Sequence, residues 1–172
     1  MKKAQYWIKH LQLKRHPEGG YFAEKYRSEE KVPAELLGKA TGGDRKLATH
    51  IYFLVDFEGF SAFHKLDADE LWHFYAGNPL LLHLIHENGS YEKILLGGEE
   101  HPFFCLVPAG IWFAAEVLDE EDYALVGCTM APAFDFGGFE LGERQQLQTQ
   151  FPQHANLIER LSRIQNYSSS ST

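Results

Sequence analysis

Between Leu47 and Met130, eight short apolar segments follow one another with turns between them, and this repetition limits the folds open to the chain. The segments are rich in β-branched and aromatic residues, which fit the pleated surface of a sheet. Short strands at regular spacing are typical of β-sandwiches and barrels. The sequence therefore predicts an all-β fold built from LATHIYFLV, FSAFHKL, ELWHFYA, LLLHLIH, YEKILL, FFCLVP, IWFAAEVL and YALVGCTM.

The dipeptide Asn88-Gly89 lies between two of these segments, LLLHLIH and YEKILL. Asn-Gly is the preferred pair for a two-residue type I′ turn, because both central residues of that turn need a positive φ. We therefore expect a β-hairpin with Asn88 and Gly89 at its tip.

The flanking segments have different patterns. Residues 3–13 have apolar side chains at helical spacings, and residues 154–165 do so near the other end, so each predicts a short helix. Residues 168–172 are predicted to be a disordered tail. We expect a single domain over residues 1–172, with a barrel core at about 20–141.

Two loops stand out before the repeated strands. Gly19-Gly20 in HPEGGYF permits a backbone bend before a strand over residues 21–27, and a structural corner is the simplest interpretation of it, so Glu18 is only a weak site candidate. Residues 28–46 are polar and rich in glycine. A loop of that length is often functional, and we interpret it as a lid.

Charge and composition exclude several classes of partner. Acidic residues outnumber basic ones by 24 to 16, so a phosphate-neutralising surface for nucleic acid is not expected. No apolar run reaches the length of a membrane span, and Lys9 and His10 interrupt the only apolar stretch near the start. A cytoplasmic protein is therefore expected, with Cys105 and Cys128 as reduced, buried packing residues.

The segment over residues 59–77 resembles the first motif of the cupin superfamily. His64 matches its first histidine, Glu70 matches its glutamate, and glycines flank the segment at the expected places. Leu66 stands where the second histidine is expected, and in the second motif, PxGxxH, Phe113 stands at the place of the histidine. Leu66 and Phe113 cannot donate to a metal, which needs three or four converging donors. No metal or other cofactor is therefore expected, unless bulges re-aim His73 or His50.

A finer resemblance points to the cupin 5 family, described as a domain of unknown function. It rests on four motifs that occur in order over residues 16–141: HPEGGYFAEKYRS, SAFHKLDADELWHFYAG, VPAGIWFAAE and ALVGCTMAPAFDFGGFEL. The resemblance implies an RmlC-like double-stranded β-helix, or jelly roll, with an aromatic pocket inside the barrel. It also implies a homodimer.

Alternation along the strands predicts which side chains face that pocket. If Glu70 points inward, Trp72 and Phe74 do so too, and an inward His64 takes Ala62 and Leu66 with it. The same rule gives Ile111, Phe113 and Ala115 on the other motif strand. The sequence thus predicts a largely aromatic small-molecule pocket that contains one histidine and one carboxyl group.

Three further residues complete the predicted ligand-binding set. His50 and Tyr52 share one face of their strand, although the pattern does not say whether that face is the pocket or the outside. The guanidinium of Arg27 can bind a carboxylate or a phosphate, or can equally form a salt bridge with Glu18 or Glu24.

Three functions fit these residues. The leading hypothesis is a metal-independent epimerase or isomerase for a sugar-like or carboxylated metabolite, in which His64 removes a proton and Glu70 orients His64 or returns the proton. The second is a non-catalytic metabolite sensor. The third is a metal-dependent oxygenase with a degenerate ligand set. The structural alternative is that His64 and Glu70 form a buried hydrogen-bonded pair with no catalytic or binding role.

Overall fold

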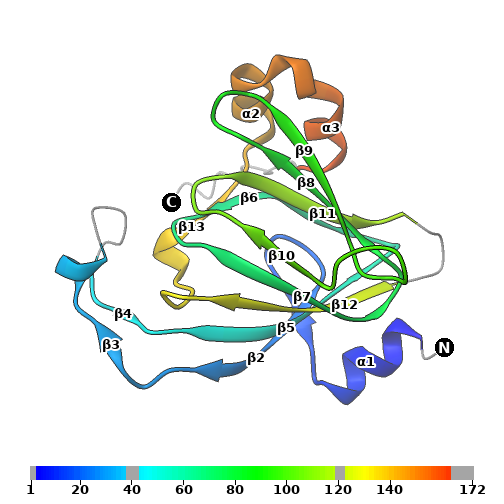
Figure 1. Ribbon diagram of the computed structural model, residues 1–172. Helices are drawn as coiled ribbons and strands as arrows, with labels where there is room; N and C mark the ends of the chain where they lie inside the picture. The colour runs from blue at the N-terminus through cyan, green and yellow to red at the C-terminus, as the bar shows by residue number, and fades with distance from the viewer. Residues whose placement is uncertain (1–2, 38–42, 119–122, 164–172) are drawn as a thin grey trace, which may run out of the picture.

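Two antiparallel sheets face each other in the computed structural model, which describes residues 3–37, 43–118 and 123–163 (Figure 1). The larger sheet has the order β1 (Lys14–Arg15), β2 (Tyr21–Arg27), β5 (Thr49–Asp56), β12 (Tyr123–Met130), β7 (Glu70–Gly77) and β10 (Phe104–Val107). The second sheet has the order β13 (Phe139–Leu141), β6 (Phe60–Leu66), β11 (Trp112–Val117), β8 (Leu80–Ile85) and β9 (Tyr91–Leu96). Neighbours in the chain often lie in different sheets, as in a jelly roll.

The predicted all-β fold is confirmed. Each of the eight apolar segments contains one of the strands β5 to β12, because alternating side chains give each strand a face that the opposite sheet can bury. The double-stranded β-helix that the family resemblance implied is the fold of the chain.

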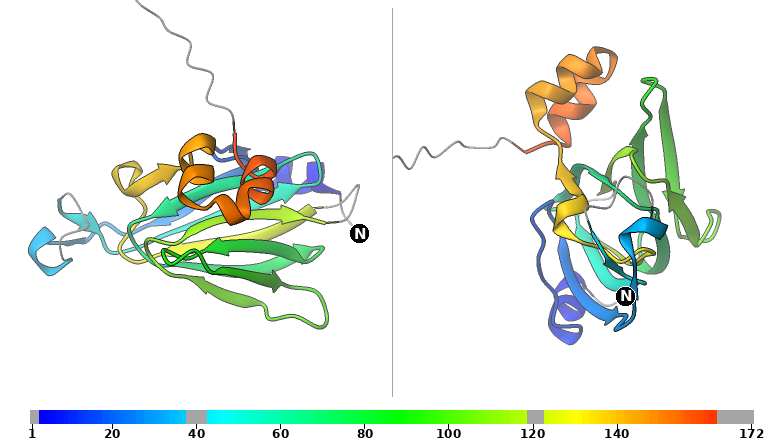
Figure 2. Two further views of the ribbon diagram at one scale, coloured as in Figure 1. Left: turned by 90° about the horizontal axis from the view of Figure 1, so that it is seen from above. Right: turned by 90° about the vertical axis from the view of Figure 1, so that its left-hand side faces the viewer.

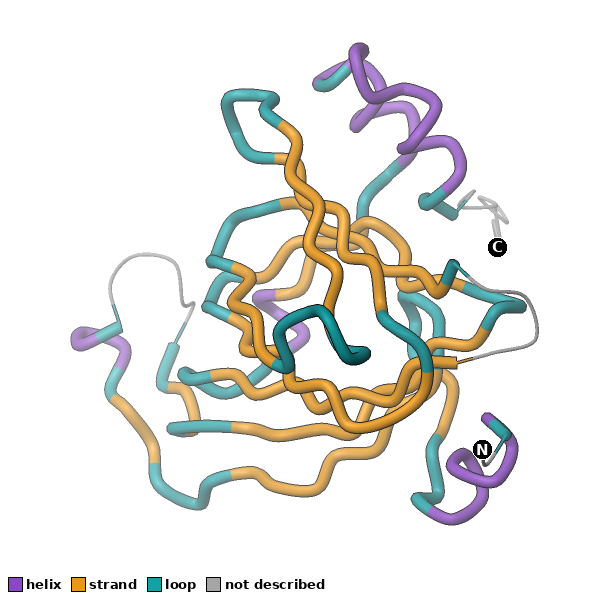
Figure 3. The backbone as a smooth tube through the Cα atoms, turned by 45° about the vertical axis from the view of Figure 1, so that its right-hand side comes forward, coloured by secondary structure: helices purple, strands orange, loops and turns teal. Residues whose placement is uncertain are grey.

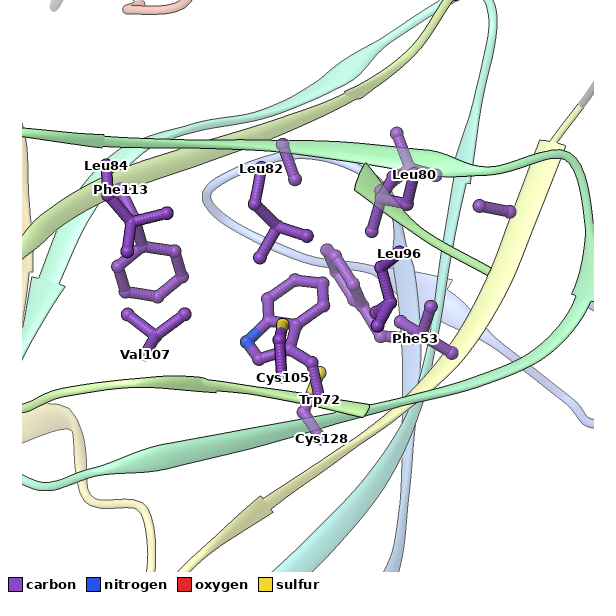
Figure 4. Packing of buried hydrophobic residues seen from close by; sticks show 14 of the residues in the cluster. Phe53, Trp72, Leu80, Leu82, Leu84, Leu96, Cys105, Val107, Phe113 and Cys128 are labelled. Carbon is purple, nitrogen blue, oxygen red and sulfur yellow. The ribbon is translucent and has the colours of Figure 1, made fainter. Parts of the chain in front are cut away.

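The core lies between the two sheets. Trp72 of β7 occupies its middle, with Phe53 on one side and Phe113 on the other (Figure 4). The Trp72 ring is edge-on to both neighbours, at centroid distances of 5.8 Å and 6.2 Å. Leu80, Leu82 and other inward residues of β8 close the core from the second sheet.

The predicted hairpin forms between β8 and β9, but its turn is not type I′. The Gly89 backbone N–H donates to the His86 carbonyl at 2.8 Å, so Glu87 and Asn88 are the central residues of the turn. Gly89 has a φ of +79°, whereas Asn88 is not among the residues with positive φ. The Asn88 side chain instead accepts a hydrogen bond from Ser90 N–H at 2.9 Å. This local bond favours a longer loop that places only the glycine in the left-handed region.

Helices cover the outside of both sheets (Figures 2 and 3). The helix α1 (Ala4–His10), shorter than the predicted 3–13, packs on the larger sheet through Trp7. The other sheet is covered by α2 (Arg144–Gln150), the 3₁₀ turn Pro152–His154 and α3 (Ala155–Arg160). The sequence had predicted one helix here, over 154–165. No helix of the described chain has the length and apolar character needed to cross a membrane.

The 28–46 segment is not a plain loop where it is described. It contains a small two-stranded sheet, β3 (Lys31–Val32) with β4 (Arg45–Lys46), and a 3₁₀ turn over Ala34–Leu36. Its residues 38–42 lie outside the described residues, as does the tail predicted at 168–172. Cys105 and Cys128 are buried and free, as the sequence indicated.

Candidate active site

A cavity of about 300 Å³ opens between the sheets, on the inner face of the larger one. Its walls are mostly apolar, and they include Phe22, Phe53, Leu66, Trp72, Met130 and Phe134. Its polar residues are His16, Glu18, Glu24, Arg27, Thr49, His64, Glu70 and Asp135. Phe136, which is 63% exposed, marks the rim.

Glu18 is the hub of the polar groups. It belongs to the corner between β1 and β2, and its side chain is almost completely buried. Its Oε1 accepts a hydrogen bond from the Ser61 hydroxyl at 2.8 Å. Its Oε2 lies 3.3 Å from His16 Nδ1 and 3.3 Å from His64 Nε2. One carboxylate is therefore shared by a hydroxyl and two imidazoles.

The glycine corner holds Glu18 in this position. Gly19 has a φ of +119°, and a Cβ there would lie only 2.0 Å from the Phe60 carbonyl oxygen. The Glu18 carbonyl accepts hydrogen bonds from Ala62 N–H at 2.9 Å and from Arg163 Nε at 3.1 Å. The corner thus packs against β6 so closely that only glycine fits at position 19.

A β-bulge in β6 turns two of the polar partners of Glu18, Ser61 and His64, toward it. Phe113 pairs with His64, but Ala115 pairs with Ser61, so β6 has one residue more than β11 between these pairs. The extra residue breaks the alternation and places Ser61 and His64 on the same side. The prediction that Ala62 shares the inward face of His64 assumed regular alternation, and it is Ser61 that reaches Glu18 instead.

His64 is neutral and poised to accept a proton. Its Nδ1 lies 2.7 Å from the Ala62 carbonyl, which can only accept, so Nδ1 carries the hydrogen and Nε2 presents its lone pair to Glu18. The 3.3 Å separation from Glu18 exceeds the 2.7–2.9 Å or so of a charge-assisted hydrogen bond. Burial lowers the pKa of His64, and Glu18 and the Ala62 carbonyl only partly oppose this shift.

Glu18 itself is ionised at neutral pH. Burial raises its pKa, but the attraction to the protonated form of His64, present at low pH, and the hydrogen bonds and charge of its other partners lower it by more, so the net pKa falls below its ordinary value. Glu18 and His64 therefore form a buried pair that lacks the proton both could hold.

Glu70 is in the opposite protonation state. It is 7% exposed, and its Oε2 accepts a hydrogen bond from Trp72 Nε1 at 2.8 Å. Burial and the nearby charge of Glu18 raise the pKa of Glu70 to about 8, against the hydrogen bond from Trp72. Glu70 therefore carries a proton at neutral pH. It reaches the cavity from β7, whereas His64 reaches it from β6 in the facing sheet.

The predicted ligand-binding residues divide into two groups. Trp72 and Arg27 line the cavity with His64 and Glu70. Arg27 is bound by Glu24 through three contacts of 2.7–3.1 Å, and its Nη1 donates to the Phe134 carbonyl at 3.1 Å. Phe113 lies behind His64, with ring centroids 4.0 Å apart, and is not part of the wall.

The other predicted residues lie away from the cavity. Phe74 packs into the core against Phe103. Because Ile51 and Phe53 line the cavity, the alternating residues His50 and Tyr52 point to the outer face of the larger sheet. His50 contacts the Thr129 hydroxyl there at 2.8 Å. We therefore leave His50, Tyr52 and Phe74 out of the site.

Sequence reasoning missed the importance of His16 and Glu18. The only signal was HPEGG itself, in which two glycines follow a carboxylate and an imidazole. Such a corner lets polar side chains approach a neighbouring strand closely, but its partner strand could not be identified before the fold was known.

The residues present do not fit a metal ion. Leu66 contributes an aliphatic wall, and Phe113 packs against His64 where a second-motif ligand would be needed. In the described part of the chain, no three histidine, cysteine, aspartate or glutamate side chains are arranged to hold a metal.

Comparisons with known proteins point to one group. The family model described as "Cupin superfamily (DUF985)" matches residues 5–142. A hypothetical protein from Leishmania major is 36% identical, with a TM-score of 0.85 over 94% of this chain and 99% of that one. A Shewanella oneidensis protein is 34% identical, with a TM-score of 0.85 over 96% of this chain and 100% of that one.

A more distant structure shares only the fold. The dTDP sugar isomerase from Desulfovibrio desulfuricans is 15% identical, with a TM-score of 0.53 over 76% of this chain and 88% of that one. No curated protein matches the chain.

Proposed function

The chain belongs to the Cupin_5 family of the cupin superfamily, and from this premise we propose that its cavity is the active site of a metal-independent isomerase or epimerase. The observation that carries the proposal is the pairing of an unprotonated base with a protonated acid at one cavity. His64 with Glu18 is the base, and Glu70 is the acid. Groups whose pKa values are pushed apart in this way are the usual acid and base of a proton-transfer site.

His64 and Glu18 act together as the base, with His64 Nε2 3.3 Å from Glu18 Oε2. A proton that arrives at His64 Nε2 is held by the imidazole and attracted by the Glu18 carboxylate. The Ala62 carbonyl fixes the tautomer and the ring orientation through Nδ1. The Ala62 carbonyl thus takes the orienting role that the sequence gave to Glu70, and Glu18 supplies the negative charge beside His64.

The acid acts on the oxygen of the substrate. Glu70 can donate its proton to a carbonyl oxygen while Trp72 holds its other oxygen. The C–H bond beside the carbonyl breaks, its proton passes to His64, its electron pair forms a C–C double bond, and the carbonyl oxygen takes the proton of Glu70. When the enol proton goes back to Glu70 and a proton returns to the other face of the same carbon, the product is an epimer; in an α-hydroxy carbonyl compound, a proton delivered instead to the former carbonyl carbon gives an isomer. No oxidant or metal is consumed.

Deuterium incorporation tests this proposal. The protein is incubated in D₂O with a panel of small aldehydes, ketones and oxo acids, and α-proton signals are followed by NMR. We expect at least one compound to exchange faster with the wild-type protein than with His64→Ala. Leu106→Ala, on an exposed residue outside the cavity, should retain the wild-type rate. Equal exchange with wild type and His64→Ala across the panel would contradict the proposal.

The homodimer and the cytoplasmic location stay predictions. Size-exclusion chromatography with light scattering checks the first, and fractionation of the source cells checks the second.

A further inference from the structure

The charges at the cavity bear on what it binds, if the proposed proton transfer is correct. Four carboxyl groups line it, from Glu18, Glu24, Glu70 and Asp135, against one guanidinium, from Arg27. Arg27 is already bound by Glu24 and the Phe134 carbonyl. His64 is neutral, and His16 already faces Glu18, with Nδ1 3.3 Å from Oε2. The lining residues therefore offer an anion no uncommitted cation.

An anionic ligand would meet the like charge of Glu18, whereas the protonated Glu70 adds no charge. A carboxylate or phosphate placed near Glu18 would lose its hydration and gain no opposite charge in return. Binding it would require Arg27 to leave Glu24. The geometry thus disfavours the carboxylated substrate that the sequence left open.

A cationic ligand is also poorly matched. The oxygens of Glu18 already face Ser61 and two imidazoles, and Glu24 is paired with Arg27. Asp135 uses Oδ1 to accept a hydrogen bond from the Gly137 N–H. An ammonium group would therefore compete for carboxylates that have partners.

The rest of the wall favours an apolar body over a sugar. Phe22, Phe53, Leu66, Met130 and Phe134 offer no hydrogen bonds to hydroxyl groups. Each buried sugar hydroxyl would need a partner, because an unpaired buried polar group is costly. The volume of about 300 Å³ is roughly twice the ~150 Å³ cavity that holds benzene in another protein. One ring with a short substituent fits this space.

We propose that the substrate is a neutral carbonyl compound with an apolar ring or chain, bound with its carbonyl oxygen at Glu70 and its apolar part against the Phe22 and Phe53 side of the cavity. The α-carbon then lies toward His64 and Glu18. The class is that of ketones and aldehydes that enolise, and the reaction stays within one molecule.

Three one-ring probes of matched size test the substrate class. Acetophenone is neutral, benzoate is anionic and benzylamine is cationic, and their affinities are measured by ligand-observed NMR at pH 7. We expect acetophenone to bind at least tenfold more tightly than either charged probe. Glu70→Leu should weaken acetophenone binding about tenfold, whereas Glu70→Gln, whose amide can still donate, should keep most of it. Leu106→Ala is the matched control and should bind like wild type.

The same probe separates this inference from the proposed function. The methyl protons of acetophenone lie beside its carbonyl, so their exchange in D₂O reports proton transfer. Tighter binding of benzoate or benzylamine, or equal binding of all three probes, would overturn the substrate class, whatever the exchange result. Selective acetophenone binding with equal methyl exchange in wild type and His64→Ala would keep the substrate class and contradict the base assignment.

Discussion

Glu18 Oε2 lies 3.3 Å from His64 Nε2, and both side chains are almost completely buried. The contact joins the glycine corner before β2 to the inward face of β6. A carboxylate and a lone pair in such proximity, away from water, form a site that gains from accepting a proton. This relationship makes the pair more than a remnant of the cupin motif.

The titration of His64 depends on Glu18. Burial lowers the pKa of His64, and the charge of Glu18 raises it. Glu18→Gln removes that charge, so the pKa of His64 should fall further below its value in the wild-type protein. NMR of the imidazole signals against pH measures the change, with Glu24→Gln as the control at the cavity mouth. An unchanged or higher pKa in Glu18→Gln would show that the two groups are not coupled.

Glu70 makes stability depend on pH. A glutamate side chain ordinarily has a pKa of 4.5, and Glu70 in the folded protein has a pKa of about 8. Unfolding at a pH between these two values therefore releases a proton. The resulting stabilisation is fully present below about pH 4.5 and is lost as pH rises through about 8. Glu70→Gln lacks this dependence. Its free energy of unfolding relative to wild type should therefore rise by up to about 1.4 kcal/mol per pH unit between these limits.

Urea unfolding at pH 5, 6.5 and 8 measures this difference. Glu140→Gln, on an exposed carboxylate paired with Lys65, should show no comparable trend. A pH-independent difference between Glu70→Gln and wild type would mean that Glu70 is ionised in the folded protein.

The positions of Leu66 and Phe113 explain the poor fit to a metal, and the double variant Leu66→His/Phe113→His should reverse it. It places one imidazole on β6, the strand that carries His64, and the other on β11, at the position that pairs with His64. We expect elemental analysis after Zn²⁺ loading and gel filtration to give about one metal per chain for the variant. The same treatment of wild type should leave none. Stoichiometric metal in wild type that disappears in His64→Ala would reverse this conclusion. Circular dichroism confirms that each protein is folded.

Much of the fold could be predicted because strand patterns are local. The alternation in segments such as ELWHFYAG gave the strand and the inward direction of Glu70 and Trp72. The jelly-roll arrangement of the strands was expected from the family resemblance instead.

The site could be predicted only in part, because what decides which side chains enter it is not local. The bulge in β6 decides that Ser61 faces Glu18, and the pattern of FSAFHKL gives no sign of it. The role of the corner that carries Glu18 can be recognised only once β6 is known to lie beside it. His50 lies on a strand with apolar residues on both faces, because α1 covers part of the outer side, so periodicity could not decide its direction.

The close approach at Gly19 gives a structural prediction. Alanine there needs a positive φ and a Cβ within 2.0 Å of the Phe60 carbonyl oxygen. Gly19→Ala should therefore lose about 1–3 kcal/mol of stability and displace Glu18. Gly43→Ala is the control, because a Cβ there has no atom within 4 Å. Thermal unfolding of the two variants measures the effect, and equal stability would contradict the packing described for the corner.

The rate of α-proton exchange against pH, for a compound that the wild-type protein deuterates, tests the central claim most directly. The rate should rise as Glu18 and His64 lose their protons and should fall near pH 8 as Glu70 loses its own. Glu70→Gln should remove the fall at high pH, and His64→Ala should lower the plateau by a factor of about 10²–10⁴. A decline near pH 8 that persists in Glu70→Gln, or a plateau that survives His64→Ala, would contradict the account.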